Sequence, residues 1–258
     1  MSDSLLYQVE KNVGYLTINR PDRRNAITQD MIASFQEYLE RIRGDEEIKA
    51  VCITAAGDRI FCSGADLGVT LSGQGDERLK GARNYASLLK EMTEFEKPLV
   101  AKVNGPCLAG GLGLMLSCDI VMARDDAYFC TPEVNVGIFP MMVGALLLRH
   151  VGLKRTMDMV LTARKVSARE GEAAGLITKA VPPEDLDKEV EKILQGLTQK
   201  SPISLKIGKK AFRDTWDMSF GEAVDHLCQA LGEVIATEDA AEGMRAFLEK
   251  RKPEFKGC

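Results

Sequence analysis

A glycine pair set between two apolar segments is the feature that most constrains how this chain folds. The segment Leu99–Val103 is short and largely apolar, as in a buried strand, and Asn104-Gly105-Pro106 ends it in a turn. A second apolar segment opens at Ala109-Gly110-Gly111 and closes at Ser117. Glycines at a helix start have no Cβ, so the unpaired backbone N–H groups stay approachable. We therefore expect a short helix whose N-terminus favours an anion or a developing oxyanion.

A carboxylate follows this expected helix. Glu133 comes directly after the bend at Thr131-Pro132, and the residues around it are apolar: Phe129, Val134, Val136, Ile138 and Phe139. Such surroundings raise the pKa of a carboxyl group toward the range that acid–base catalysis uses. An oxyanion site and one carboxylate together suffice for moving a proton next to a carbonyl group. The alternative is a surface glutamate that merely follows a proline turn.

The remaining pattern first mixes strands with helices and is helical at the end. Strands are expected at 5–10, 13–19, 50–54 and 180–181, and helices at 28–43, 76–95, 143–150, 153–162 and 167–175. After Pro182-Pro183 the expected helices span 184–198, 202–215, 219–236 and 238–250. This order predicts an α/β fold followed by a helical region, whose apolar faces pack on the protein's own core or on a sister subunit.

The net charge, the uncharged runs and the cysteines of the sequence argue against several classes of protein. A net charge of −4 argues against a nucleic-acid partner, although a local basic patch stays open. The longest uncharged run, 134–148, is shorter than the roughly 20 residues of a membrane-spanning helix. The polar start has no apolar signal segment. Seven cysteines without CxxC spacing and only two histidines favour reduced thiols and no metal site. We expect a soluble, cytoplasmic protein.

Four segments together resemble the enoyl-CoA hydratase/isomerase family, also called the crotonase family. NRPDRRNAI at 19–27 is similar to its N-terminal CoA-contact motif, and FCSGADL at 61–67 to its first oxyanion segment. AGGLGLMLSCD at 109–119 is similar to the second oxyanion segment, and TPEVNVGIFP at 131–140 to the segment with the catalytic glutamate. Each motif alone is weak, but all four in the family's order and spacing are specific.

The resemblance implies an architecture and an assembly. Residues 1–198 would form a crotonase-like spiral of repeated ββα units that holds the acyl-CoA site. Residues 199–258 would form a C-terminal helical region that joins chains into homotrimers or dimers of trimers (hexamers). The protein would be an enoyl-CoA isomerase or enoyl-CoA hydratase of fatty acid metabolism. Coenzyme A would enter as part of the substrate, with no separate cofactor.

The resemblance also assigns roles to particular residues. The oxyanion hole would be formed by the backbone amides of Ala65 and Gly110, and Glu133 would be the acid/base. The positions matching substrate or CoA contacts are Arg24, Ala26, Ser63, Ala65, Asp66, Leu67, Gly110 and Gly113. The two basic clusters at 206–213 and 250–256 fit either CoA phosphates or solvated surfaces. Close helix packing is the alternative explanation of the glycine pair; a dinucleotide fingerprint is rejected because its third glycine is missing.

One position departs from the hydratase pattern. Family hydratases carry a first glutamate three residues after the oxyanion glycine, where this chain has Gly113. With Glu133 alone, a one-base proton shuttle that moves the double bond is easier to write than the addition of water. We therefore expect isomerisation to be slightly preferred, with hydration, thioester hydrolysis or decarboxylation, and non-catalytic acyl-CoA binding as alternatives. We also expect Gly113 to open space for an acyl group or a water.

Overall fold

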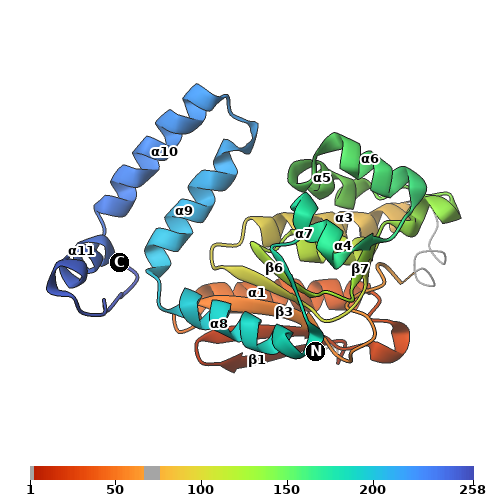
Figure 1. The fold of residues 1–258 in the computed structure, drawn as a ribbon, viewed down its shortest axis with the longest axis horizontal. Helices are drawn as coiled ribbons and strands as arrows, with labels where there is room; N and C mark the ends of the chain where they lie inside the picture. The colour runs from red at the N-terminus through yellow and green to blue at the C-terminus, as the bar shows by residue number, and fades with distance from the viewer. Residues whose placement is uncertain (1–2, 67–75) are drawn as a thin grey trace.

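The computed structural model describes residues 3–66 and 76–258. A six-stranded sheet in the order β1-β2-β3-β4-β6-β9 forms the centre of its body (Figure 1). The first pair is antiparallel and the other neighbours are parallel. The strands are β1 (Leu5–Glu10), β2 (Val13–Ile18), β3 (Ala50–Ala55), β4 (Leu99–Val103), β6 (Ile120–Arg124) and β9 (Lys179–Val181).

Helices cover both faces of this sheet. On one face lie α1 (Gln29–Gly44), α3 (Asp76–Thr93) and α4 (Gly110–Leu116), which share the larger apolar core. On the other face, α8 (Leu186–Thr198) places Leu186, Val190 and Leu194 against a separate cluster from the strands. Every residue of β3 is buried, and alternate side chains go to the two cores. A strand covered on both faces needs this continuous apolar run.

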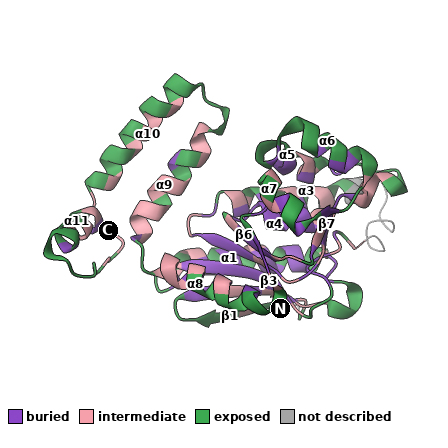
Figure 2. Cartoon of the chain, in the orientation of Figure 1, coloured by how far each residue is buried: buried purple, intermediate pink, exposed green. Residues whose placement is uncertain are grey.

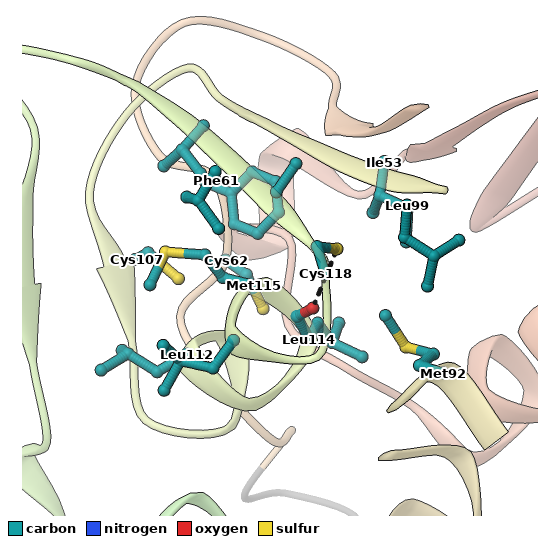
Figure 3. Close-up of a cluster of buried hydrophobic side chains, with 14 of the residues drawn as sticks. Ile53, Phe61, Cys62, Met92, Leu99, Cys107, Leu112, Leu114, Met115 and Cys118 are labelled. Atoms are coloured by element: carbon teal, nitrogen blue, oxygen red, sulfur yellow. Dashed lines mark hydrogen bonds between the residues drawn. The ribbon is translucent and has the colours of Figure 1, made fainter. Parts of the chain in front are cut away.

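A smaller sheet, in the order β5-β7-β8, lies beside α4 and carries the segment that leads to Glu133. Its strands are β5 (Cys107–Leu108), β7 (Tyr128–Cys130) and β8 (Val166–Ser167). The core around α4 is rich in sulfur: Cys62, Cys107, Met115 and Cys118 lie close together in Figure 3. The Cys118 thiol donates to the Leu114 carbonyl oxygen at 3.4 Å. Packing this tight holds the start of α4 in place.

The remaining helices complete the body and extend beyond it. Helix α7 (Ala168–Ala174) packs on the smaller sheet, while α5 (Met141–His150) packs between α4 and α6 (Gly152–Thr162). The described elements also include four 3₁₀ turns: η1 (Pro21–Arg23), η2 (Pro132–Val136), η3 (Pro183–Asp185) and η4 (Thr215–Asp217). Helices α9 (Pro202–Asp214), α10 (Phe220–Ile235) and α11 (Glu238–Glu249) project away from the sheet (Figure 1). Figure 2 shows α10 largely exposed, α9 mainly of intermediate burial, and α11 mixed.

The helix starts predicted from capping residues are confirmed. The Thr28 hydroxyl accepts from the Met31 N–H at the start of α1, and Ser167 and Ser219 form the two capping boxes of α7 and α10. The short strands β5, β6, β7 and β8 were not predicted. These four segments are two to five residues long, which leaves little periodicity to read, and none of them was singled out by a flanking turn signal as Leu99–Val103 was. The division at residues 198 and 199 falls between α8 and α9 and stays a prediction as a domain boundary.

Candidate active site

The two segments predicted to supply oxyanion donors lie against each other. The Leu108 N–H donates to the Cys62 carbonyl at 2.8 Å, which joins the first segment to the strand before α4. Gly64 has φ +94°, and a Cβ placed on it would lie 2.5 Å from the Ala109 Cβ and 3.1 Å from the Gly110 nitrogen. Only glycine accepts both this backbone conformation and this approach. Ala65 and Gly110, which are 45 positions apart in the chain, are therefore brought together.

The amides of Ala65 and Gly110 stay available in this arrangement. The neighbouring groups are used: the Ile27 N–H donates to the Gly64 carbonyl at 2.8 Å, and the Asp66 N–H donates to the Ile27 carbonyl at 2.9 Å. Among the described residues, neither the Ala65 nor the Gly110 N–H donates a hydrogen bond to another protein group. Gly110 is the first residue of α4, where an N–H has no partner within the helix.

Ala109 holds the start of α4 in a strained conformation. Its φ of 48° and ψ of −127° are rare for a residue with a Cβ, and such strain costs about 1–3 kcal/mol. Two hydrogen bonds keep it there: the Ala109 N–H donates to Cys130 at 2.9 Å, and its carbonyl accepts from Leu112 at 3.0 Å. The strain orients the following peptide group, which carries the Gly110 N–H.

Glu133 is held in a short 3₁₀ turn above the smaller sheet. Thr131 is buried and its hydroxyl donates to the Met159 carbonyl at 3.1 Å, which anchors η2 to α6. The Oε2 atom of Glu133 is buried and accepts no hydrogen bond from any described residue. Burial raises the pKa of the Glu133 carboxyl, and its own backbone N–H lowers it in part. A buried carboxylate oxygen without a partner is unfavourable when the group is ionised, so the carboxyl protonates more readily, which suits an acid/base.

The predicted CoA-contact residues gather around one loop. The Ser63 N–H donates to the Arg24 carbonyl at 3.1 Å, and the Arg24 side chain is exposed. The Arg20 guanidinium donates to the Ala26 carbonyl at 2.7 Å and to the Asp66 carboxylate at 3.2 Å. Asp66 therefore helps to hold the loop through Arg20, a residue that the sequence interpretation missed. Leu67 and the glycine-rich loop 68–75 lie outside the described residues.

Asn25 is a second residue that the sequence interpretation missed. It is buried with φ +53°, and its side chain accepts from the Arg20 N–H at 3.0 Å. Its amide nitrogen donates to the Ala56 carbonyl at 3.1 Å and to the Ile60 carbonyl at 2.9 Å. Asparagine tolerates positive φ better than most residues, which was the available signal within the motif at 19–27. The side chain thus fastens this loop to the chain that leads to Ser63.

The open space expected at Gly113 is absent, and that expectation was wrong. The position is filled from α3 by Tyr85, which is only 8% exposed. A Cβ at 113 would overlap the Tyr85 Oη and would lie 3.1 Å from its Cζ and 3.2 Å from Leu89 Cδ1. The Tyr85 hydroxyl donates to the carbonyl of Gly110. No local sequence pattern could place Tyr85 against Gly113, because Tyr85 lies on α3 and Gly113 lies on α4.

The basic cluster at 206–213 has a structural explanation. Lys206 contacts Glu96 at 3.0 Å, Lys210 contacts Asp214 at 2.6 Å, and Lys209 pairs with Asp119 while also donating to the Lys97 carbonyl at 2.9 Å. These bonds tie α9 to itself and to the body. Near the C-terminus, Arg251 pairs in the same way with Glu242 at 2.6 Å. The paired residues are therefore weaker candidates for CoA phosphate contacts.

The described residues can also be compared with what a metal site, a membrane-spanning helix and a disulfide require. Across residues 3–66 and 76–258, no three or more potential ligands from His, Cys, Asp and Glu are grouped as a metal ion would need. Within the same ranges, none of the helices has both the length and the apolar character that crossing a bilayer requires. All seven cysteines are described, and all are free thiols.

Nearly the whole chain is similar in sequence to one enzyme family. The sequence model of the enoyl-CoA hydratase/isomerase family matches residues 8–258. The short-chain-enoyl-CoA hydratase of Clostridium acetobutylicum is 32% identical over 253 residues, covering 98% of this chain and 97% of that protein. The crotonyl-CoA hydratase of Syntrophomonas wolfei is 32% identical over 254 residues, with 98% of each chain covered.

The fold is shared as well. The crystal structure of enoyl-CoA hydratase from Bacillus anthracis matches with a TM-score of 0.95 at 27% identity, over 99% of this chain and 100% of that chain. Human enoyl Coenzyme A hydratase domain-containing protein 3 matches with a TM-score of 0.94 at 30% identity, over 98% of this chain and 100% of that chain. The expected α/β spiral of crotonase type is thereby confirmed. The chain belongs to the enoyl-CoA hydratase/isomerase family of enzymes.

Proposed function

We propose that the protein acts on an enoyl-CoA thioester and moves its double bond, with Glu133 as the only acid/base. The observation that carries this proposal is a buried, unpaired Glu133 carboxylate oxygen in a site whose second-carboxylate position is Gly113. A single carboxylate can remove a proton from one carbon and return it to another. No oxidant, metal or second base is needed for that shuttle.

The two free amides supply the other half of the chemistry. Removing the proton places negative charge on the thioester oxygen, which the N–H groups of Ala65 and Gly110 would hold. One such preorganised donor contributes about 3–4 kcal/mol to the transition state. The loop with Arg24, Ala26, Ser63 and Asp66 borders the first oxyanion segment, which supports it as the contact for the CoA part. Coenzyme A is then part of the substrate.

Hydration of a 2-enoyl-CoA is the second candidate, because relatives that cover nearly the whole chain bear the name hydratase. The test supplies a 2-enoyl-CoA and a 3-enoyl-CoA separately and identifies the products by mass. We expect interconversion of the two isomers to be at least as fast as the gain of one water. Rapid addition of water to the 2-enoyl substrate, without migration of the double bond, would overturn the isomerase preference.

The activity should depend on the protonation of Glu133. Burial raises the pKa of its carboxyl above the ordinary 4.5, so the base is protonated and inactive at pH values where an exposed glutamate is already ionised. We expect kcat/KM to fall on the acidic side, with a midpoint above 4.5. The measurement is kcat/KM against pH, with circular dichroism at each pH to exclude unfolding. An acidic midpoint at or below the ordinary value would contradict the assignment.

The proposal also covers the oligomeric state of the protein and its location in the cell. We propose a homotrimer or a dimer of trimers joined through residues 199–258. The structure describes α10 throughout, and this helix buries none of its side chains. Phe220 is 85% exposed and Phe247 is 83% exposed, with Val224, Leu231 and Ile235 also exposed. So large an apolar surface needs a partner. The free thiols support a cytoplasmic location.

The assembly gives a direct prediction. Light scattering of the protein should give three or six times the chain mass of 28.3 kDa. Phe220→Glu places a charge on the exposed apolar face of α10 and should lower that mass, because a charge buried at an interface is unfavourable. Asp225→Lys, on the same helix but away from this apolar face, is the control and should leave the mass unchanged. A particle of 28.3 kDa at micromolar concentration would contradict the prediction.

A further inference from the structure

Tyr85 occupies the space beside α4 that a side chain at position 113 would need. Its Oη overlaps the place of a Cβ on Gly113, and its Cζ lies 3.1 Å from that place. The same hydroxyl lies 3.5 Å from where a Cβ on Gly110 would be, and it donates to the Gly110 carbonyl. Tyr85 therefore stands at the start of α4, next to one of the two proposed oxyanion amides.

Tyr85 cannot act as a second base in this place. Burial raises the pKa of its hydroxyl well above 10.0, and the nearby thiols of Cys62 and Cys107 and the charge of Glu133 raise it further. The phenol is neutral at neutral pH, and its proton is already donated to Gly110. An effective general base needs a pKa near the working pH.

The geometry points to Tyr85 as a specificity-determining residue of the reaction: with glycine at 113, its ring occupies the space that the side chain of a second carboxylate would need, so that Glu133 works alone. This inference rests on the proposed function. It predicts that α4 has room for a glutamate at 113 only when the Tyr85 ring is removed. A glutamate placed there would then hold a water and take one of its protons as the O–H bond breaks. The water oxygen bonds to the β-carbon, the C=C double bond becomes single, and the protonated Glu133 delivers a proton to the α-carbon, so that one water is added in all.

The experiment combines substitutions at both positions. Gly113→Glu alone should lower the melting temperature by about 5 °C or more, because the tyrosine ring blocks the new side chain. Tyr85→Ala alone should also lower it, because it leaves a cavity. The double variant Tyr85→Ala with Gly113→Glu should lose less than the two single losses added together. It should also add water to a 2-enoyl-CoA at least about tenfold faster than either single variant.

Two controls keep the test decisive. Gly196→Glu places the same residue in α8, where a Cβ meets nothing within 4 Å, and it should neither couple to Tyr85→Ala nor change the products. Should Gly113→Glu fail to fold, Gly113→Ala with and without Tyr85→Phe repeats the thermal test, since phenylalanine removes only the overlapping Oη. In either pair, the double variant should lose less melting temperature than the two single variants added together.

The outcomes separate this inference from the proposed function. Additive losses of melting temperature, or an unchanged ratio of hydrated to isomerised product in the double variant, would overturn the role of Tyr85. A wild-type protein that converts neither a 2-enoyl-CoA nor a 3-enoyl-CoA would instead overturn the proposed function. Changes in the product ratio cannot come from a residue that only stabilises the fold, because such a residue alters the amount of active protein and not its products.

Discussion

Replacing Glu133 by glutamine should lower kcat by about 10²- to 10⁴-fold, the typical contribution of a positioned acid/base. Glutamine keeps the size and the hydrogen-bonding shape of the side chain but cannot take up the substrate proton. The structure shows a buried Oε2 with no described partner, so no other group is arranged to replace it there. The measurement is steady-state turnover of a 3-enoyl-CoA, with KM expected to change little.

The same variant should not be less stable at neutral pH. The folded-state pKa of Glu133 is raised by burial, so the ionised form destabilises the fold at pH values above that pKa. Removing the charge should therefore keep or raise the melting temperature at pH 7, and the gain should shrink as the pH falls through the raised pKa. Glu184→Gln, at an exposed glutamate, is the control and should leave both turnover and melting temperature unchanged. Turnover within a few-fold of wild type would remove Glu133 from its role.

Replacing Gly64 by alanine should cost about 10²- to 10³-fold in kcat, as losing one oxyanion donor does elsewhere. The new Cβ would lie 2.5 Å from the Ala109 Cβ and 3.1 Å from the Gly110 nitrogen, so the two segments must separate. The amides of Ala65 and Gly110 would then no longer point at one oxygen atom. The measurements are kcat of the folded variant and its affinity for an acyl-CoA thioester, whose carbonyl oxygen the two amides would bind.

The loss of kcat in Gly64→Ala could come from the steric contact of the new Cβ or from alanine at positive φ, and a second glycine at positive φ separates these two causes. Gly152 has φ +74°, but a Cβ on it meets nothing within 4 Å. Gly152→Ala should therefore show the stability cost of alanine at positive φ without the loss of turnover. Equal kcat in the two variants would show that the contact of Gly64 with Ala109 and Gly110 does not shape the site.

Sequence reasoning proposed Ala65 and Gly110 from the resemblance of their segments to family motifs, and Glu133 from that resemblance together with its apolar neighbours. It did not find Arg20 or Asn25 as parts of the site. Asp66 lies 46 positions from Arg20, and the 3.2 Å pair between them depends on how two loops meet. The roles of the site residues themselves stay predictions until the variants above are measured.

The largest error concerned Gly113. A missing side chain in a sequence indicates missing volume, and we expected space there. Protein interiors leave few voids, so a neighbouring side chain usually takes the volume that a glycine gives up. Here that neighbour is Tyr85, which lies on a different helix and 28 positions earlier in the chain. Which side chain fills a gap is decided by the packing of α3 on α4.

The sequence by itself determined the elements whose signals are local: the cap at Thr28, the capping boxes at Ser167 and Ser219, and the buried run of β3. A helix cap or a strand pattern needs only a few consecutive residues, so it survives without knowledge of the rest of the chain. The tertiary structure alone decided which distant groups meet, such as Gly64 with Ala109 and Tyr85 with Gly113. Those contacts follow from close packing between helices and loops, which no local pattern encodes.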